Sequence, residues 1–213
     1  MDQRAIVKNI LKRRFAAAKR GIDSENVNTV IDLPIDRVRN YTYKHPESYN
    51  GFSLLQLAIE IGDAELFDFL IEKGADVNLL TKQPHHTRPL HYAIDFNRIG
   101  FIRTLVEQGA DVNAVAALHY TPLHQVAKNY YDAATSSKMI DLLLAKGASI
   151  NARDYLGRTP EELAAAFQNQ TVVDLLPART GPTRSRSRRL TRTRSSSSVS
   201  VSGRSSYRKT RRS

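Results

Sequence analysis

Histidine is the residue of this chain best suited to acid–base chemistry or metal binding, because its imidazole titrates near neutral pH and is a common metal ligand. His85, His86 and His91 lie close together in the sequence. The chain has no cysteine, and no carboxylate completes a recognised zinc spacing around these histidines. Nucleophile elbows, phosphate-binding glycine loops and paired catalytic carboxylates are also missing from the sequence. We therefore predict a non-enzymatic protein with no metal and no cofactor, in which His85 and His86 are exposed contacts on a loop.

Arginine supplies the other strong chemical signal, because nearly all of the net charge lies in one segment. Residues 177–213 contain eleven Arg, one Lys and no acidic residue, a charge of +12, whereas residues 1–176 sum to −1. The segment is rich in Ser and Thr and too poor in apolar residues to form a core, so we predict that it is disordered. Such a tail suits nonspecific contact with nucleic-acid phosphates, a nuclear-import or secretion address, or phosphorylation beside its basic residues. A solubilising role is the alternative. The arginines proposed for polyanion contact or targeting are Arg184, Arg186, Arg188, Arg189, Arg192 and Arg194.

Two short phrases recur along the middle of the chain at a nearly constant spacing. One begins at residues 53, 88, 121 and 159 and is most complete in the segment Thr121-Pro122-Leu123-His124. The other reads Gly-Ala-Asp-Val-Asn or a close variant and begins at Gly74, Gly109 and Gly147. Once insertions near residues 80–86 and 130–137 are removed, the period is 33 residues. A fixed period of this length is typical of stacked repeats, which bury an apolar face only against their neighbours.

The residues in and between these phrases indicate two helices in each repeat. Pro89, Pro122 and Pro160 suit the first turn of a helix, where an N–H group would have no helical partner. Thr121 and Thr159 precede two of these prolines and are expected to act as N-caps. Apolar residues then recur at helical spacing up to each glycine, which suits the left-handed residue that ends a helix.

A 33-residue period with these two phrases in fixed register resembles the ankyrin repeat. The resemblance covers residues 51–176 and implies an all-α repeat solenoid, a stack of helix pairs joined by β-turn hairpins. We expect repeats near 51–83, 86–118, 119–156 and 157–176. The last repeat has glutamates in place of Leu and His and is followed by Pro177, so we interpret it as a C-terminal cap. The resemblance also implies that His91 and His124 are structural and hydrogen-bond the backbone of neighbouring turns.

The first fifty residues match the repeat poorly, and we interpret residues 1–50 as an N-terminal capping region. Residues 1–20 carry seven basic residues and one acid, and their apolar residues follow helical spacing, which predicts a basic amphipathic helix. Its apolar face is expected to dock on the first repeat, and contact with an anionic membrane is the alternative. A second helix is predicted from Ser24 to Leu33, ending before Pro34. No apolar run is long enough to span a bilayer, and no secretory signal is evident.

A partner-binding site follows from the resemblance, because the hairpin tips and first helices of ankyrin repeats line a concave groove. The tips here are rich in aromatic residues, which dominate binding hot spots. The predicted tip contacts are Tyr49, Phe52, His85, His86, His119, Tyr120 and Tyr155, and the predicted contacts at the ends of the first helices are Glu60, Asp95, Lys128 and Asn129. Packing between adjacent hairpins is the alternative for each aromatic residue. The inserted Tyr130-Tyr131 segment is a second candidate contact.

We therefore expect a monomeric adaptor that holds a protein segment in this groove, while the tail contributes targeting or polyanion affinity. One alternative is a nucleic-acid-associated protein that binds mainly through its tail. Another is a pathogen effector or viral mimic of host ankyrin proteins. We expect a location in the cytoplasm or nucleus, or delivery into a host cell, and the identity of the protein partner stays open.

Overall fold

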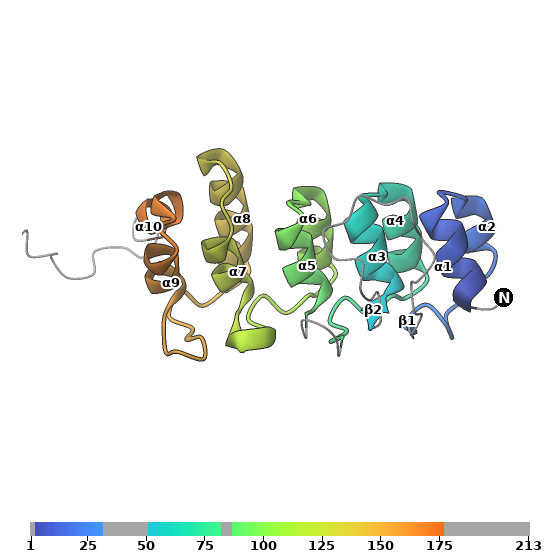
Figure 1. The fold of residues 1–213 in the computed structure, drawn as a ribbon, viewed down its shortest axis with the longest axis horizontal. Helices are drawn as coiled ribbons and strands as arrows, with labels where there is room; N and C mark the ends of the chain where they lie inside the picture. The colour runs from blue at the N-terminus through green and yellow to red at the C-terminus, as the bar shows by residue number, and fades with distance from the viewer. Residues whose placement is uncertain (1–2, 32–50, 82–86, 177–213) are drawn as a thin grey trace, which may run out of the picture. The chain divides into compact units, whose positions relative to one another are not determined.

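The computed structural model describes residues 3–31, 51–81 and 87–176, and within these ranges it contains ten α-helices in five consecutive pairs (Figure 1). The pairs are α1 (Gln3–Leu11) with α2 (Phe15–Lys19), α3 (Leu54–Ile61) with α4 (Ala64–Glu72), α5 (Pro89–Asp95) with α6 (Ile99–Glu107), α7 (Pro122–Lys128) with α8 (Ala133–Ala145), and α9 (Pro160–Ala166) with α10 (Gln170–Leu175). The helices of each pair contact each other, and the first helices of successive pairs contact one another from α3 to α9. The second helices α6, α8 and α10 are also in contact. The predicted all-α repeat stack is confirmed.

Hydrogen bonds at the start of the repeats explain why three of the four copies of the repeated phrase begin with a hydroxyl residue. Ser53 caps α3 by accepting from the Gln56 backbone N–H at 3.1 Å, and the Gln56 side chain accepts from the Ser53 N–H at 3.0 Å. Thr159 and Glu162 form the same reciprocal pair at the start of α9. These capping boxes satisfy N–H groups that have no partner within the helix. The N-cap role predicted for Thr159 is confirmed.

The N-terminal segment forms a complete helix pair, where the sequence predicted one helix over residues 1–20. The first helix ends at Leu11 and the second begins at Phe15. Ile6, Val7 and Ile10 belong to the buried hydrophobic core of the stack. The apolar face of this segment therefore docks on the stack, as a cap would, and is not available to a membrane.

The helix predicted from Ser24 to Leu33 is wrong for the described part of that segment. Residues 24–28 form turns, and β1 (Val30–Ile31) pairs antiparallel with β2 (Phe52–Ser53), with Val30 opposite Ser53. The competing signal was present in the sequence, since Val27-Asn28 matches the end of the Gly-Ala-Asp-Val-Asn phrase. A turn former at this position outweighs the weak helical pattern.

Three asparagines, Asn28, Asn78 and Asn113, join each repeat to the next through the same pair of hydrogen bonds. The side-chain amide donates to the carbonyl of the glycine that follows the next second helix, at 3.2, 3.0 and 2.9 Å. The side-chain oxygen accepts from the backbone N–H two residues beyond that glycine, at 2.6, 2.8 and 2.7 Å. Asn28 takes part although no Gly-Ala-Asp phrase precedes it, so the first helix pair is joined to the stack in the same way as the later repeats.

The residues inserted in the third repeat mainly lengthen its second helix. Helix α8 has 13 residues, whereas α4 and α6 have 9 each, a difference of about one helical turn. Asp132 caps the lengthened helix by accepting from the Thr135 N–H at 2.9 Å. Just before it, the Tyr131 hydroxyl donates to the Ile94 carbonyl at the end of α5. The insertion predicted near residues 130–137 is therefore largely helical.

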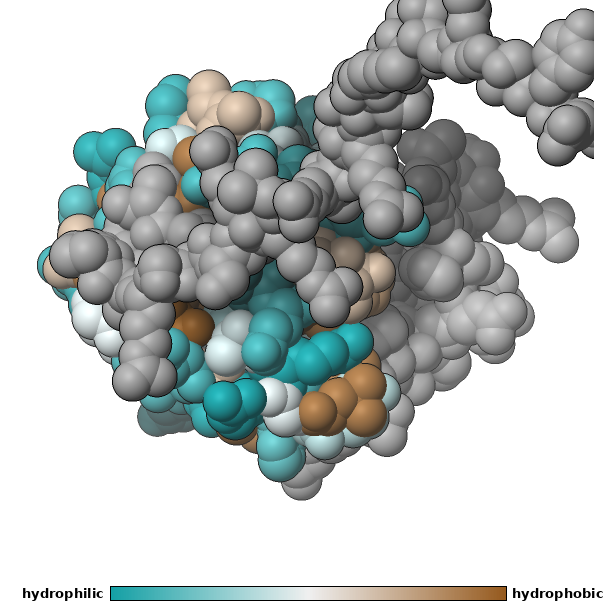
Figure 2. Space-filling view, turned by 90° about the vertical axis from the view of Figure 1, so that its left-hand side faces the viewer, coloured by the Kyte–Doolittle hydropathy of each residue, from teal (hydrophilic) through white to brown (hydrophobic). Residues whose placement is uncertain are grey.

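The hydrophobic core extends from one helix pair to the next, and its aromatic members also contact each other across repeats. Phe67 of α4 and Phe101 of α6 stack with ring centroids 4.3 Å apart. Figure 2 looks toward the α9–α10 end, where hydrophilic residues surround scattered hydrophobic ones among the described residues. Exposed residues of these two helices include Glu162, Gln170 and Asp174. A polar surface of this kind suits a terminal repeat, which has no further repeat to cover it.

Candidate functional site

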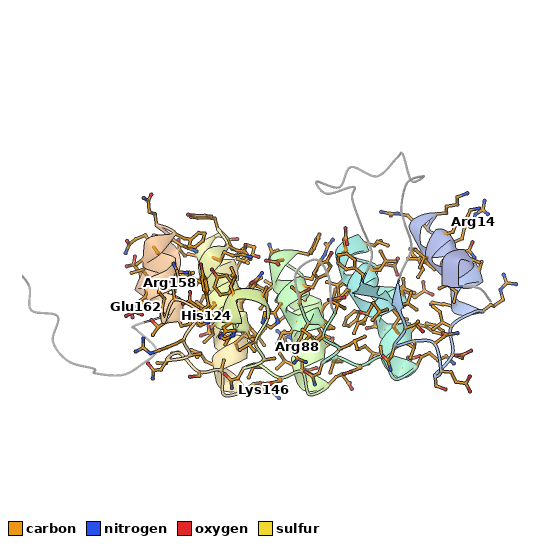
Figure 3. All side chains as sticks on the ribbon, turned by 60° about the horizontal axis from the view of Figure 1, so that its bottom comes forward. Arg14, Arg88, His124, Lys146, Arg158 and Glu162 are labelled. Carbon is orange, nitrogen blue, oxygen red and sulfur yellow. The ribbon has the colours of Figure 1, made fainter. Side chains whose placement is uncertain are left out.

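His124 is a structural link between the third and fourth repeats of the predicted set. It is buried in α7, its Nδ1 accepts from the Thr121 backbone N–H at 3.3 Å, and the Thr121 hydroxyl lies 2.9 Å from the same nitrogen. The opposite nitrogen, Nε2, therefore carries the proton and donates to the Arg158 carbonyl at 3.0 Å. Figure 3 shows His124 and Arg158 together at the junction of α7 and α9. Burial lowers the pKa of His124, in agreement with a neutral ring.

His91 occupies the same position one repeat earlier, but only one of its two ring nitrogens has a hydrogen-bond partner. Its Nε2 lies 3.0 Å from the Tyr120 carbonyl, while its Nδ1 is buried without a hydrogen-bond partner among the described residues. The cause is Arg88, which stands where the next repeat has Thr121 and which donates through Nη1 to the Asn78 carbonyl. Burial lowers the pKa of His91 to about 4. The predicted structural role of both repeat histidines is confirmed by their hydrogen bonds to neighbouring turns.

Three of the predicted groove residues are buried in the stack. Phe52 is 9% exposed and packs against Tyr92 with ring centroids 5.4 Å apart. The Tyr92 hydroxyl donates at 2.7 Å to the carboxylate of Glu60, which is also buried. Tyr120 is 7% exposed and stacks on His124 with ring centroids 5.8 Å apart. The alternative of packing between neighbouring repeats therefore describes Phe52 and Tyr120, and all three side chains offer little surface to a partner.

Exposed apolar side chains gather on two neighbouring hairpin tips. Val115 and Leu118 of one tip are 49% and 51% exposed, and Tyr155 and Leu156 of the next are 54% and 58% exposed. The Tyr155 backbone N–H donates to the Leu118 carbonyl at 3.1 Å, so the two tips are in contact. His119, beside Leu118, is exposed as well. Sequence reasoning selected Tyr155 and His119 but missed the other three, which appear in the sequence only as large apolar residues between the repeated phrases.

An ion pair between the buried Asp154 and the partly exposed Arg158 anchors the tip that carries Tyr155. Arg158 Nη2 lies 2.7 Å from Asp154 Oδ2, and Arg158 Nε donates to the same oxygen at 2.9 Å. Asp154 Oδ1 accepts from the backbone N–H groups of Leu156 and Arg158, each at 2.9 Å. Burial by itself would raise the pKa of Asp154, but the hydrogen bonds from Arg158 and the backbone lower it overall. The backbone of this tip is therefore held by its own buried carboxylate.

The predicted residues at the ends of α5 and α7 form one partly exposed polar cluster. Asp95 accepts from the side-chain amides of Gln125 at 2.5 Å and Asn129 at 2.8 Å. Lys128 Nζ lies 3.8 Å from the same carboxylate, and the side chains of Lys128 and Asp95 are 33% and 29% exposed. These contacts join α5 to α7 and still leave charged surface to solvent.

Several predicted contacts lie outside the described residues. They are Tyr49, His85 and His86, and the tail arginines Arg184, Arg186, Arg188, Arg189, Arg192 and Arg194. Within residues 3–31, 51–81 and 87–176, no helix has both the length and the apolar character needed to cross a bilayer. The same ranges contain no group of three or more His, Asp or Glu that could hold a metal ion.

Comparison with known proteins agrees with the repeat geometry. A family model of three ankyrin repeats matches residues 15–116, and a single ankyrin-repeat model matches residues 118–155. The ankyrin repeat protein FPV228 of fowlpox virus (strain NVSL) is 32% identical over 133 residues, which cover 56% of this chain and 25% of that protein. Ankyrin repeat and SOCS box protein 11 of Mus musculus is 32% identical over 107 residues, covering 50% of this chain and 31% of its own length. Tyrosine-protein kinase HTK16 of Hydra vulgaris is 26% identical over 154 residues, which cover 71% of this chain and 19% of that protein.

The matched region spans less than a third of each of these relatives, so the similarity concerns the repeats and not the whole proteins. The family match begins at residue 15, in α2, and so includes part of the N-terminal helix pair that the repeated phrases did not reveal. Ankyrin repeats bind protein partners and are generally non-enzymatic. The recurring phrases, the stacked helix pairs and these matches together show that the chain belongs to the ankyrin-repeat family of protein-interaction modules.

Proposed function

We propose that this chain is a non-enzymatic adaptor that holds a segment of a partner protein against its hairpin tips and the adjoining first helices. The observation that carries the proposal is the group of exposed apolar side chains formed by Val115, Leu118, Tyr155 and Leu156, which we call the tip patch. Contiguous exposed apolar side chains mark interaction sites on soluble proteins, because leaving them in water lowers solubility without stabilising the fold.

The backbone of the tip patch supports the same proposal. Leu118 and His119 both adopt left-handed conformations, with φ of 61° and 56°. Such conformations are disfavoured for residues with a β-carbon by about 1–2 kcal/mol each. Strain of this kind is commonly found where a side chain must be presented at a functional site. In this protein, the strained residue Leu118 presents its exposed side chain beside Tyr155.

The other predicted contacts have different roles in this proposal. Asp95 and Lys128 are partly exposed and would add the polar contacts that surround the apolar centre of most interfaces. Tyr49, His85 and His86 remain predicted contacts. Phe52, Glu60 and Tyr120 are assigned to the stack itself because they are buried.

The test compares partner capture from nuclease-treated lysate by the full chain and by two variants. Leu118→Ser/Tyr155→Ser removes two exposed apolar side chains of the tip patch, and loss of a tyrosine hot spot such as Tyr155 weakens binding by about 30-fold or more. Phe167→Ser is the matched control, because Phe167 is an aromatic residue that is 37% exposed and lies outside both the patch and the predicted contacts. We expect the double variant to lose the captured protein and the control to retain it. Equal recovery by the double variant and the parent would exclude the tip patch as the binding site.

A second candidate function, nucleic-acid association mainly through the tail, is favoured by the charge of +12 on residues 177–213. It predicts partners that disappear on nuclease treatment and on replacement of the tail arginines by glutamine. Action as a pathogen effector or viral mimic is a third candidate, and the similarity to a fowlpox ankyrin protein supports it. It predicts that the captured protein also binds an ankyrin protein of the host and that the two compete.

A further inference from the structure

The turn between α1 and α2 carries a concentration of positive charge that the stack does not neutralise. Lys8, Lys12, Arg13 and Arg14, which we call the basic edge, are all exposed. Residues 3–22 contain no Asp or Glu. Among the described residues, the ion pairs of this helix pair comprise only Lys19 with Glu65, at 2.6 Å. The cations of the basic edge therefore form no ion pair within the described fold.

The conformation of Arg13 shows that positive charge at this turn is not required by the fold. Arg13 has φ of 53°, its N–H donates to the Ile10 carbonyl at 2.8 Å, and the Arg14 N–H donates to the Asn9 carbonyl at 2.8 Å. This is the Schellman pattern of helix termination, in which glycine is the preferred left-handed residue. The left-handed residue of the corresponding turns in later repeats is Gly62, Asn97 or Gln168. A cation that occupies a position better suited to glycine indicates a role other than closing the helix.

The structure also indicates which kind of anionic ligand the basic edge would bind. A membrane contact needs an apolar face beside the cations, and here that face is buried in the core through Ile6, Val7 and Ile10. A protein interface usually has an apolar centre. Among the side chains described within residues 5–10 and 12–30, none is an exposed large hydrophobic one. Exposed Lys and Arg without apolar neighbours are instead suited to the phosphates of a nucleic-acid backbone.

We propose that the basic edge is a folded nucleic-acid-binding site, separate from the tail, that contacts backbone phosphates through Lys8, Lys12, Arg13 and Arg14. Each phosphate neutralised by such a cation releases condensed counterions, so binding is independent of base sequence and weakens as salt rises. The site does not depend on partner binding by the tip patch.

The test measures binding of a fluorescently labelled 20-base-pair DNA duplex by the full chain between 50 and 200 mM salt. Lys12→Gln/Arg13→Gln/Arg14→Gln removes three charges from the basic edge. Arg103→Gln/Lys138→Gln/Lys146→Gln removes three exposed charges elsewhere in the fold and is the matched control. The tail is unchanged in both variants, so its contribution cancels. Because log K falls by about 0.9 per log unit of salt for each phosphate contact, the edge variant should have a slope smaller by about 2.7. Across this range, its affinity would then fall about 40-fold less than that of the parent.

Two further measurements complete the test. Arg13→Gly keeps the turn and should melt at a temperature no lower than the parent while its salt slope decreases by about 0.9. Vesicles containing phosphatidylserine provide the membrane comparison. Equal slopes and affinities for the two triple variants would overturn the proposal. It would also be overturned if the edge variant lost vesicle binding while its DNA binding remained at the level of the control.

Discussion

Replacing Arg88 by threonine is expected to stabilise the protein, because the change would complete the hydrogen bonds of a buried histidine. In the present chain, His91 Nδ1 and Arg88 Nε are both buried without partners among the described residues. One repeat later, Thr121 places its hydroxyl 2.9 Å from Nδ1 of His124. Arg88→Thr would give His91 the same neighbour.

The expected change in the free energy of unfolding follows from the polar groups that gain or lose a hydrogen-bond partner. A buried polar group without a hydrogen bond costs about 1–3 kcal/mol, and the substitution relieves two of them. The loss of the bond from Arg88 to the Asn78 carbonyl costs about 1.5–3 kcal/mol, and water partly offsets it because Asn78 is half-buried. We expect the free energy of unfolding to rise by about 1–2 kcal/mol and Tm by about 2–8 °C.

Urea unfolding of the full chain, followed by circular dichroism, measures this change. Arg88→Val is the matched control, because valine has nearly the shape of threonine and no hydroxyl. It removes the arginine but leaves His91 Nδ1 without a partner, so it should be less stable than Arg88→Thr by about 1–3 kcal/mol. Equal stability of the threonine and valine variants would refute the argument that the missing hydroxyl destabilises this repeat.

The remaining predictions concern pH, a turn glycine and an inter-repeat asparagine. Because the pKa of His91 is about 4 in the fold and 6.5 without it, the unfolded chain binds the proton first as pH falls. The contribution of neutral His91 to the free energy of unfolding is complete above about pH 6.5, decreases toward pH 4 and totals about 3 kcal/mol. Urea unfolding between pH 7.5 and pH 4 would detect this loss, and a stability that did not change with pH would contradict it. Gly62→Ala should lower Tm more than Gly74→Ala. Both positions have positive φ, but a β-carbon at Gly62 would lie 2.6 Å from the Arg98 guanidinium, whereas the space at Gly74 is open. Equal Tm losses would show that the guanidinium moves aside. Asn113→Ala removes two hydrogen bonds between repeats and should cost about 1–3 kcal/mol in urea unfolding, and an unchanged midpoint would show that water replaces both.

The fold was largely predictable because the repeated phrases encode local hydrogen bonds. Thr159 and Glu162 cap α9 through atoms only three residues apart, and Gly74 ends α4 with a left-handed conformation. Such features depend on neighbouring residues in the chain, so they can be recognised wherever the phrase recurs. The N-terminal helix pair was missed because it lacks the Gly-Ala-Asp phrase. Its connection to the stack depends on Asn28, which bonds to a repeat nearly fifty residues later.

The candidate site was less predictable, because exposure depends on contacts between repeats. Tyr120 and Tyr155 both lie on hairpin tips and carry the same side chain. The ring of Tyr120 packs on His124 and is buried, while Tyr155 remains 54% exposed. The sequence by itself determined the repeat and its helix ends, since these follow from local spacing, and the resemblance to the ankyrin repeat implied the structural role of its histidines. Only the tertiary structure decided which tip residues face solvent and which cations lack a partner, because both depend on side chains brought together from distant parts of the chain.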